Sequence, residues 1–457
     1  MIAYATNQFE SAGAQPPQIS VIGTGYLGTT HAVCMAELGF QVVGVDVDDL
    51  KVAQLADGIL PFFEPGLEEL LRKNLEAGRL TFTTSFPAAT TADVHFLCVG
   101  TPQRPDSPAA DLRHLGAAVD ALLAAQPKPG SLLVGKSTVP MGTAAAVATR
   151  LAAEAPEVLL AWNPEFLREG FAIEGTLNPD RIVLGLPDDP AARARAEDIL
   201  RAVYASAIES GTPVVVTDFA TAELVKVAAN AFLATKISFI NAMAEVCEAA
   251  GGDVKTLATA LGHDARIGPR FLAAGVGFGG GCLPKDIRAF RARAEEIGAG
   301  TAVRFLAEVD AINLRRRARV VEFATELVGG SVPGRRMAVL GAAFKPNSDD
   351  IRDSPALEIA ELLRTAGALV TVTDPAAIPN ARRRYRELRY ADTAFEAVDD
   401  ADLVLHLTEW ADFREIDPAL LGGNVRNLLV IDGRNTLDAG KWRAAGWSYY
   451  ALGRPNA

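Results

Sequence analysis

The feature that most constrains the fold is a glycine-rich motif between two short apolar runs near the amino terminus. The run from Ile19 to Ile22 precedes Gly23-Thr24-Gly25-Tyr26-Leu27-Gly28, and the run from Gln41 to Val45 ends at Asp46. Glycines in this spacing allow a tight turn and let a pyrophosphate approach the next helix, while an acid after the second strand accepts hydrogen bonds from a ribose diol. The pattern therefore predicts a strand–helix–strand unit that binds a dinucleotide.

The acid after the second run also distinguishes between the two nicotinamide dinucleotides. A carboxylate at Asp46 repels a 2′-phosphate, so the sequence favours NAD over NADP. We expect the residues of the motif to contact this cofactor, namely Gly23, Gly25, Tyr26, Leu27 and Gly28.

Strand-like and helix-like segments alternate along most of the chain. One series of apolar runs follows the glycine motif, and a second series follows Pro333-Gly334. Such alternation implies mostly parallel sheets with helices on both faces, so we predict an α/β protein with two doubly wound, Rossmann-like domains. The runs are Val94–Val99, Leu132–Gly135, Val158–Trp162 and Ile182–Gly185, then Met337–Leu340, Leu369–Thr373, Leu403–Leu407 and Leu428–Ile431.

A helical central region with a long connecting helix is expected between the two domains. From about Thr217, with Asp218 as the N-cap, apolar residues continue through Phe239 and Met243. We predict a flexible tail over residues 1–18, an NAD-binding domain over 19–216, the central region over 217–328 and the second domain over 329–457. The tail lacks the basic and apolar stretches of a signal peptide.

Composition narrows the class of protein. With 457 residues, of which 49% are hydrophobic and 22% charged, the chain can form two or three domains with substantial cores. A net charge of −12 argues against a nucleic-acid partner, and no uninterrupted apolar run approaches a membrane span. The cysteines are too scattered for a disulfide framework or a zinc pair, so we expect a reducing cytoplasm and no metal site. They are Cys34, Cys98, Cys247 and Cys282.

One cysteine stands at the end of a glycine run, in the segment from Gly275 to Asp286 that reads GVGFGGGCLPKD. Pro284 suits the first position of a helix, which would place the Cys282 thiol beside the free N–H groups and the positive dipole end of that helix. This environment favours the thiolate, and hence a nucleophile. The alternative is a mobile turn followed by a buried structural cysteine.

Polar residues follow three predicted strands and also punctuate the long helix. Thr101, Thr138 and Glu165 stand after strands, and ligands of open α/β sheets lie at the carboxyl ends of strands, so these residues are candidates for one crevice. Lys226 and Asn230 share a helix face and could aim two donors at an oxygen. Alternatively, the lysine simply extends to solvent.

The second domain lacks the glycine motif. Its strand ends carry Phe344-Lys345-Pro346, Ile351-Arg352-Asp353-Ser354-Pro355 and Asp432-Gly433-Arg434. These segments could bind phosphates or uracil through their side chains, or could merely cap the sheet.

Together these motifs resemble the UDP-glucose/GDP-mannose dehydrogenase family over nearly the whole chain. The cysteine loop is highly specific for that family, although many members have serine where this chain has Gly281. The nucleophile, Lys285 and Asp286 remain in place. Further points of resemblance are Glu64-Pro65-Gly66-Leu67, Val99-Gly100-Thr101-Pro102, Ser137-Thr138-Val139-Pro140, Asn163-Pro164-Glu165-Phe166-Leu167 and Ala343-Phe344-Lys345-Pro346.

The resemblance implies an enzyme that oxidises the C6 alcohol of a nucleotide sugar to a carboxylate, using two NAD and one water. The chain most resembles members that convert UDP-glucose to UDP-glucuronate, with GDP-mannose or a UDP-N-acetylhexosamine as alternative substrates. A non-catalytic nucleotide-sugar sensor is a further alternative, but a sensor would have no use for a thiolate. The resemblance also implies a homodimer or higher homo-oligomer that pairs through its central region and binds nucleotide sugar with its second domain. From composition we expect this protein to be cytoplasmic, with no membrane or nucleic-acid partner.

Catalytic roles follow from the same resemblance. Cys282 would form a thiohemiacetal and then a thioester, while Lys226 and Asn230 would stabilise the oxyanion. Asp286 would position a water together with Thr138.

Glu165 would act as a base in thioester hydrolysis. Arg266 would reach the substrate of a neighbouring subunit, or else be a solvated loop charge. The resemblance implies contacts to NAD from Asp46, Lys51, Thr101, Thr138, Glu169, Lys285 and Arg352. It implies contacts to the substrate from Glu165, Phe166, Leu167, Arg168, Glu169, Lys226, Asn230, Arg266, Phe271, Leu272, Ala273, Ala274, Gly275, Gly279, Phe344, Lys345 and Arg434.

Overall fold

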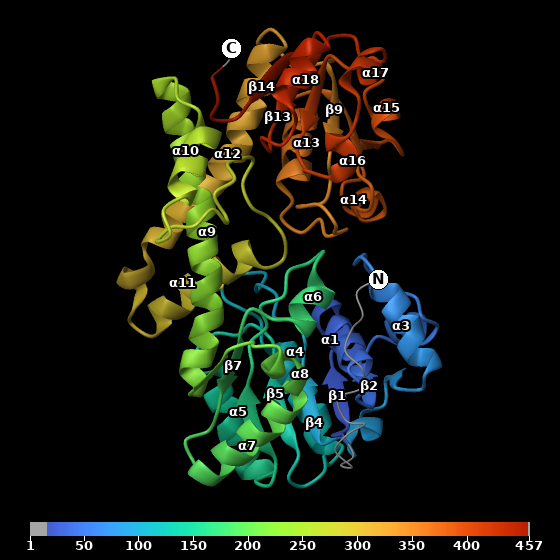
Figure 1. Cartoon of the computed structure of the whole chain (residues 1–457), viewed down its shortest axis with the longest axis vertical. Helices are drawn as coiled ribbons and strands as arrows, with labels where there is room; N and C mark the ends of the chain where they lie inside the picture. The colour runs from blue at the N-terminus through green and yellow to red at the C-terminus, as the bar shows by residue number, and fades with distance from the viewer. Residues whose placement is uncertain (1–15, 456–457) are drawn as a thin grey trace. The chain divides into compact units, whose positions relative to one another are not determined.

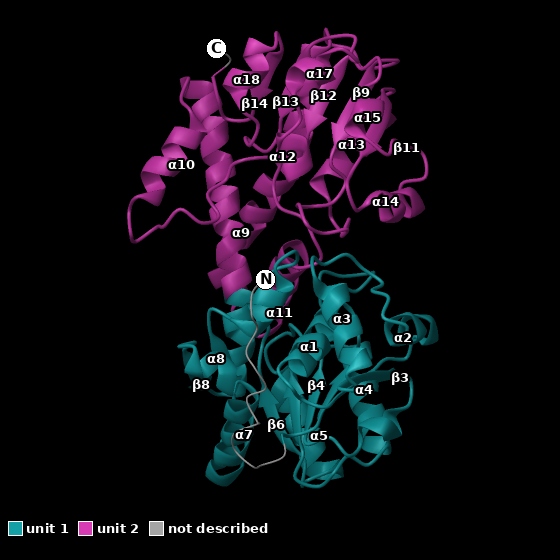
Figure 2. Cartoon of the chain, turned by 45° about the vertical axis from the view of Figure 1, so that its right-hand side comes forward, with its two compact units in different colours: residues 1–228 teal, residues 229–457 magenta. Residues whose placement is uncertain are grey.

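The computed structural model of the chain describes residues 16–455, which form two compact units with a boundary between Ala228 and Ala229 (Figure 2). Of the tail predicted over residues 1–18, positions 1–15 lie outside the described residues. Each unit contains one doubly wound, mostly parallel sheet, and a helical region precedes the second sheet (Figure 1). The predicted fold class is confirmed.

The first unit is built on an eight-stranded sheet with the order β3-β2-β1-β4-β5-β6-β7-β8. Adjacent strands are parallel except β6 and β7, which pair antiparallel through Trp162 and Gly185. The order reverses between β1 and β4, so the carboxyl ends of these strands lie where such sheets bind ligands. The strands are β1 (Ile19–Ile22), β2 (Val42–Val45), β3 (Leu80–Thr83), β4 (Val94–Leu97), β5 (Leu132–Gly135), β6 (Leu159–Trp162), β7 (Ile182–Gly185) and β8 (Val214–Thr217).

Helices cover both faces of this sheet (Figure 1). Because successive strand residues point to opposite faces, Ile19 and Val21 join one buried cluster and Ile22 joins another. The helical elements are α1 (Tyr26–Glu37), α2 (Asp49–Ala56), α3 (Leu67–Glu76), the 3₁₀ turn η1 (Phe86–Ala89), α4 (Arg113–Ala124), α5 (Thr143–Glu154), α6 (Ala172–Leu177), α7 (Pro190–Val203) and α8 (Ala205–Glu209).

The predicted long helix is present as α9 (Phe219–Ala250), and the boundary between the two units falls within it. Asp218 caps its first turn by accepting a backbone N–H at 2.8 Å, as the sequence predicts. Glu223, which is 2% exposed, accepts the N–H groups of Gly142 and Ala144 at 2.7 and 2.6 Å. These bonds tie the first turns of α9 to the start of α5.

Helix α9 also carries an apolar stripe outside the core. Phe232, Phe239 and Val246 are 66%, 48% and 56% exposed, and their spacing of seven residues places them on one face. Among the described helices, only α9 is long and apolar enough to cross a membrane by length and composition. This is weak evidence for a membrane span, because a core helix of a soluble protein passes the same test.

The second unit contains the rest of α9, a set of helices and a six-stranded sheet with the order β11-β10-β9-β12-β13-β14, in which all pairs are parallel. The helical elements before the sheet are α10 (Val254–Gly262), α11 (Leu283–Glu296), the 3₁₀ turn η2 (Gly300–Val303) and α12 (Phe305–Leu327). The strands are β9 (Arg336–Leu340), β10 (Leu369–Thr373), β11 (Arg389–Tyr390), β12 (Leu403–His406), β13 (Leu429–Asp432) and β14 (Ser448–Ala451). The remaining helices are α13 (Pro355–Thr365), α14 (Ile378–Arg384), α15 (Ala394–Ala397), α16 (Ala411–Arg414), α17 (Pro418–Gly422) and α18 (Ala439–Ala444).

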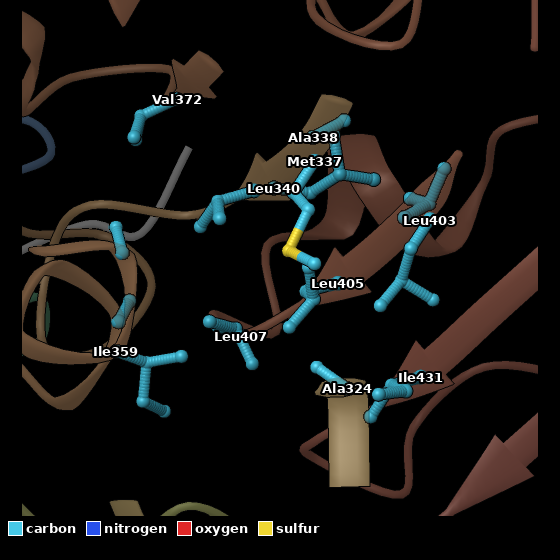
Figure 3. Close-up of a cluster of buried hydrophobic side chains, with 14 of the residues drawn as sticks. Ala324, Met337, Ala338, Leu340, Ile359, Val372, Leu403, Leu405, Leu407 and Ile431 are labelled. Carbon is cyan, nitrogen blue, oxygen red and sulfur yellow. The ribbon is translucent and has the colours of Figure 1, made fainter. Parts of the chain in front are cut away.

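The core of the second unit lies against its sheet (Figure 3). Met337 of β9, Leu405 of β12 and Ile431 of β13 are at most 1% exposed. Ile359 of α13 and Ala324 of α12 belong to the same buried cluster. Close packing of this kind tolerates little movement, so α12 has a fixed position on the sheet.

Candidate active site

The glycine turn of the first unit has the geometry of a dinucleotide cradle. Gly23 has φ +90°, and a Cβ there would lie 2.8 to 2.9 Å from Val99. A Cβ on Gly28 would collide with the carbonyl oxygen of Gly23, so α1 can start this close to β1 only with glycine. Gly25 has no neighbour within 4 Å of its Cβ position, which leaves the amino end of α1 open to a phosphate.

Asp46, the predicted ribose acceptor, follows β2 and is held by four donors. Its carboxylate accepts hydrogen bonds from the N–H of Thr24 at 2.7 Å, the hydroxyl of Thr24 at 3.1 Å, the N–H of Asp48 at 3.1 Å and Nζ of Lys51 at 2.9 Å. Burial alone would raise the pKa of Asp46, but these hydrogen bonds outweigh it and hold the pKa below its ordinary value. An ionised carboxylate at this position fits the binding of a ribose diol.

Tyr26, which we expected at the cofactor, turns its side chain to a residue that sequence reasoning left without a role. The Tyr26 hydroxyl donates to Glu64, which is 5% exposed. Glu64 also accepts the N–H groups of Gly170 at 2.6 Å and Ala172 at 2.7 Å. Burial and the Glu64 carboxylate raise the pKa of Tyr26. The glycine turn is thereby tied to the loop after β6.

The carboxyl ends of β4 and β5 meet as the sequence predicts. The Thr101 hydroxyl donates to the carbonyl oxygen of Thr138 at 2.6 Å. The Ser137 hydroxyl donates to the carbonyl oxygen of Val99 at 2.7 Å. The two loops that carry the candidate threonines therefore lie side by side.

Glu165, which follows β6, pairs with a lysine that sequence reasoning missed. Nζ of Lys136 lies 2.9 Å from Oε2 of Glu165, and Lys136 is only 3% exposed. The sequence contained one signal of this pair, because Lys136 is a charged residue directly after the apolar run Leu132–Gly135. Burial alone would raise the pKa of Glu165, but Lys136 holds it below its ordinary value. The same carboxylate raises the pKa of Lys136 against the effect of burial.

Two cations of the first unit lie near the Phe166 ring. The Arg181 guanidinium lies 3.8 Å from the ring centroid, and Nζ of Lys226 lies 5.3 Å from it. Lys226 is half-buried, and its ammonium lies near the loop after β6 that carries Phe166. In the same loop, Leu167 and Glu169 are partly buried and Arg168 is exposed.

The cysteine loop of the second unit leads into α11 as predicted. Cys282 is the N-cap of this 14-residue helix, and its side chain is exposed. Pro284 occupies the second helical position and not the first, because Leu283 already belongs to the helix. The thiol therefore lies at the positive end of the α11 dipole, and the alternative of a buried structural cysteine is wrong.

Asp286, one turn into α11, joins two other predicted residues. Its Oδ2 accepts a hydrogen bond from Nδ2 of Asn230 at 2.6 Å, and its Oδ1 accepts one from Nζ of Lys285 at 2.7 Å. Asp286 is 2% exposed. We expected Asn230 to serve an oxyanion and Lys285 to contact NAD, whereas both side chains here donate to Asp286.

Buried polar residues of α12 hold the cysteine loop. Asn313 accepts the N–H of Phe278 at 2.7 Å and donates to its carbonyl oxygen at 2.9 Å. Arg317 donates to the same carbonyl oxygen at 3.1 Å. Arg316 has Nε 3.5 Å from the carbonyl oxygen of Gly275. Sequence reasoning missed these residues, although their i, i+3 and i+4 spacing places three polar groups on one helix face.

Arg434, a candidate for substrate binding, pairs with Glu409 at 3.2 Å and donates to three backbone carbonyls. Its guanidinium reaches the carbonyl oxygens of Leu407 at 2.7 Å, Gly277 at 3.0 Å and Phe344 at 3.2 Å. In this structure Arg434 therefore braces the cysteine loop against the ends of the second sheet. Nζ of Lys345 lies 5.2 Å from the ring of Phe344.

Gly281, where the family often has serine, lies against Arg352. A Cβ at Gly281 would collide with the Arg352 guanidinium, which pairs with Asp350 at 2.7 Å. A Cβ on Gly279 would collide with the carbonyl oxygen of Asp353. The absence of side chains thus lets the loop pass close to the segment after β9.

The remaining predicted residues lie before the cysteine loop. Arg266 is exposed and pairs with Asp264 at 2.6 Å. Phe271 has φ +64° and is 38% exposed. The N–H of Gly275 donates to Oδ1 of Asn241 at 2.8 Å. In between, Leu272 and Ala274 are buried and Ala273 is exposed.

Comparison with protein families decides the classification. Residues 17–208 match the NAD binding domain of the UDP-glucose/GDP-mannose dehydrogenase family, residues 220–315 its central domain and residues 338–439 its UDP binding domain. The chain belongs to the UDP-glucose/GDP-mannose dehydrogenase family. It is an NAD-dependent dehydrogenase, and the open amino end of α1 and the ionised Asp46 fit this cofactor.

Relatives within the UDP-glucose/GDP-mannose dehydrogenase family span almost the whole chain. UDP-glucose 6-dehydrogenase of Rhizobium meliloti is 41% identical over 443 residues, which cover 96% of this chain and 100% of the relative. UDP-glucose 6-dehydrogenase TuaD of Bacillus subtilis is 40% identical over 444 residues, covering 96% and 93%.

Solved structures of the family are similar as well. A UDP-glucose dehydrogenase from Pyrobaculum islandicum has a TM-score of 0.87 and 39% identity, covering 97% of this chain and 99% of the other. A UDP-D-ManNAc dehydrogenase from Pyrococcus horikoshii has a TM-score of 0.82 and 25% identity, covering 96% and 100%.

Proposed function

We propose that the protein oxidises UDP-glucose to UDP-glucuronate through a covalent intermediate on Cys282. One observation carries the proposal: Cys282 is an exposed N-cap of α11 in a chain that matches the NAD, central and UDP binding domains of one dehydrogenase family. Relatives with about 40% identity over almost the whole chain are UDP-glucose 6-dehydrogenases, which supports UDP-glucose as the substrate.

The reaction needs two hydride transfers and one hydrolysis. The glycine turn and Asp46 would hold NAD, which would supply the hydride acceptor for both oxidations. The first oxidation converts the C6 alcohol to an aldehyde, to which the Cys282 thiolate adds with formation of a C–S bond. The resulting thiohemiacetal loses the second hydride and becomes a thioester. Water then attacks the thioester carbonyl, the C–S bond breaks, and Cys282 leaves as the thiolate.

The other polar residues are proposed to serve these steps. Lys226 stabilises the oxyanion, a role for which a donor held in place is effective. An amide has two N–H donors, so Asn230 can serve the oxyanion with the donor that it does not give to Asp286. Asp286 and Thr138 position the attacking water, and Glu165 accepts its proton.

We further propose that the protein acts as a cytoplasmic homodimer or higher homo-oligomer. The exposed stripe of Phe232, Phe239 and Val246 on α9 supports a second copy as its cover, since a stripe of large apolar side chains is unfavourable in water. Arg266 would then reach the substrate of the neighbouring subunit. The functional boundaries at residues 19–216, 217–328 and 329–457 remain a prediction.

A screen of nucleotide sugars tests the substrate. The purified protein is mixed with NAD and, separately, UDP-glucose, GDP-mannose or a UDP-N-acetylhexosamine, and NADH formation is followed spectrophotometrically. We expect the highest kcat/KM with UDP-glucose. A higher value with another sugar would reassign the substrate, and no NADH with any of them would favour a non-catalytic sensor.

A further inference from the structure

We propose that Lys136 is a positioning residue for the hydrolytic step, holding the Glu165 carboxylate ionised and in place to accept a proton from water. The inference rests on the proposed function, because it concerns the thioester formed on Cys282. Lys136 itself is given no contact with substrate or cofactor.

The ammonium of Lys136 is saturated by three acceptors. Its Nζ lies 2.9 Å from Glu165, 3.0 Å from Oδ1 of Asn163 and 3.2 Å from the hydroxyl of Tyr204. An ammonium has three N–H donors, so each one has a partner. The Tyr204 hydroxyl donates to Asn163 at 2.5 Å, and Asn163 donates to the carbonyl oxygen of Val183 at 2.9 Å. These bonds anchor the ammonium to β7 and fix its orientation.

Both oxygens of the Glu165 carboxylate have hydrogen-bonding or ionic partners, yet the carboxylate is still partly accessible to solvent. Oε1 accepts the N–H groups of Phe166 at 2.7 Å and Leu167 at 3.0 Å, and Oε2 faces Lys136. The side chain is 14% exposed. A carboxylate oxygen can accept more than one hydrogen bond, so water can approach the exposed edge.

The charge on Glu165 depends mainly on Lys136. Burial raises the pKa values of Tyr204, Cys34 and Cys98, so these three groups stay neutral beside Glu165. Burial lowers the pKa of His31, the imidazole near Lys136, so this group is neutral as well. Lys226 is the second cation, but it is half-buried. The titratable groups around the pair are Lys136 after β5, Lys226 of α9, Tyr204 after α7, Cys34 and His31 of α1, and Cys98 after β4.

Removing Lys136 should therefore raise the pKa of Glu165. Burial alone raises it, and Lys136 is the main group that opposes burial. The base acts only when ionised, and in hydrolysis it takes a proton from the water whose oxygen replaces the sulfur of Cys282. A raised pKa thus moves the acid limb of the hydrolysis rate to higher pH.

The direct test is Lys136→Met, which removes the charge and keeps a chain of similar length. Single-turnover reactions with UDP-glucose and NAD report the first hydride transfer as NADH, and intact-protein mass reports the thioester on Cys282. We expect the apparent pKa of hydrolysis to rise by at least ~1 unit, so that hydrolysis slows about tenfold or more below that pKa and the thioester accumulates there. The first hydride transfer and KM should stay within about threefold of wild type.

Two further variants separate positioning from general damage. Lys128→Met removes a surface ion pair with Asp93 and should leave the pH profile unchanged. In a Glu165→Gln background, Lys136→Met should slow hydrolysis no further, because its effect runs through Glu165. This double variant also avoids an unpaired buried charge, which helps it to fold.

An unshifted acid limb in Lys136→Met, or an equal further loss in the Glu165→Gln background, would overturn the proposal. If the Lys136→Met protein does not fold, the proposal can still be tested by a measurement that needs neither this variant nor substrate. Infrared difference spectra between wild type and Glu165→Gln should show Glu165 as a carboxylate down to below pH 4.5, its ordinary pKa. Protonation above that value would contradict the proposal, whereas absence of NADH with UDP-glucose would reject only the proposed function.

Discussion

Cys282 and Lys226 are proposed to carry different parts of the chemistry, and substitution separates them. Cys282→Ser replaces the thiol with a much weaker nucleophile, so turnover should collapse while NAD binding and the first hydride transfer survive. Lys226→Ala should slow every step that forms an oxyanion, by about 10²- to 10³-fold. Turnover and single-turnover rates with UDP-glucose and with its 6-aldehyde test both. A Cys282→Ser protein that oxidises the aldehyde at the wild-type rate would remove the cysteine from the mechanism.

The contacts of Asp46 lead to a prediction about cofactor choice. Asp46→Ala removes a ribose acceptor and a negative charge, and it releases the ammonium of Lys51, now 2.9 Å from the carboxylate, to meet a 2′-phosphate. The ratio of kcat/KM for NAD to that for NADP should therefore fall by at least about tenfold. Lys128→Met, which removes the surface pair with Asp93, is the matched control. An unchanged ratio would show that Asp46 does not discriminate between NAD and NADP.

At the scale of single residues, the sequence predicts those residues that belong to a short local motif or to the end of a strand. The GxGxxG turn, the N-cap position of Cys282 and the meeting of Thr101 with Thr138 follow from short motifs and strand ends. The residues that form hydrogen bonds or ion pairs with the site residues cannot be predicted in this way, because they are distant in sequence. Lys136 meets its network across 27 residues, and Glu64 meets Gly170 across 106.

Helix α12 fixes the cysteine loop through hydrogen bonds from its buried polar side chains. Asn313→Ala would leave the buried N–H and carbonyl of Phe278 without two of their hydrogen bonds, at a cost of ~1–3 kcal/mol. Since a misplaced nucleophile slows chemistry more than binding, kcat should fall by about tenfold or more with KM for NAD unchanged. Arg315→Ala, an exposed change on the same helix, should have little effect. Equal kcat values for both variants would refute a positioning role for Asn313.

Four strands that sequence reasoning missed, β3, β8, β11 and β14, lie at the edges of their sheets. Polar residues interrupt β3 and β14, and β11 has only two residues. The run of three valines in β8, by contrast, was a signal that could have predicted that strand. Central strands such as β1, β5 and β7 are continuous apolar runs, and their predicted bounds agree with the structure. The antiparallel pairing of β6 with β7 leaves no trace in the pattern of hydrophobic residues.

For the whole molecule, the exposed stripe on α9 predicts self-association. Placing a charge within it, as in Phe239→Glu, should weaken or abolish the oligomer, because a charge is costly to bury between apolar surfaces. Light scattering after size exclusion gives the mass of each species. Exposed Phe305→Glu of α12, outside this stripe, is the control. If Phe239→Glu keeps the wild-type mass, another surface forms the oligomer.

The stoichiometry of the complete reaction tests the central claim most directly. With limiting UDP-glucose and excess NAD, the yield of NADH per sugar is measured by absorbance, and the products are separated by chromatography. A covalent adduct on Cys282 predicts two NADH per UDP-glucose, with UDP-glucuronate as the product and no free aldehyde. One NADH per sugar with release of the aldehyde would contradict the account.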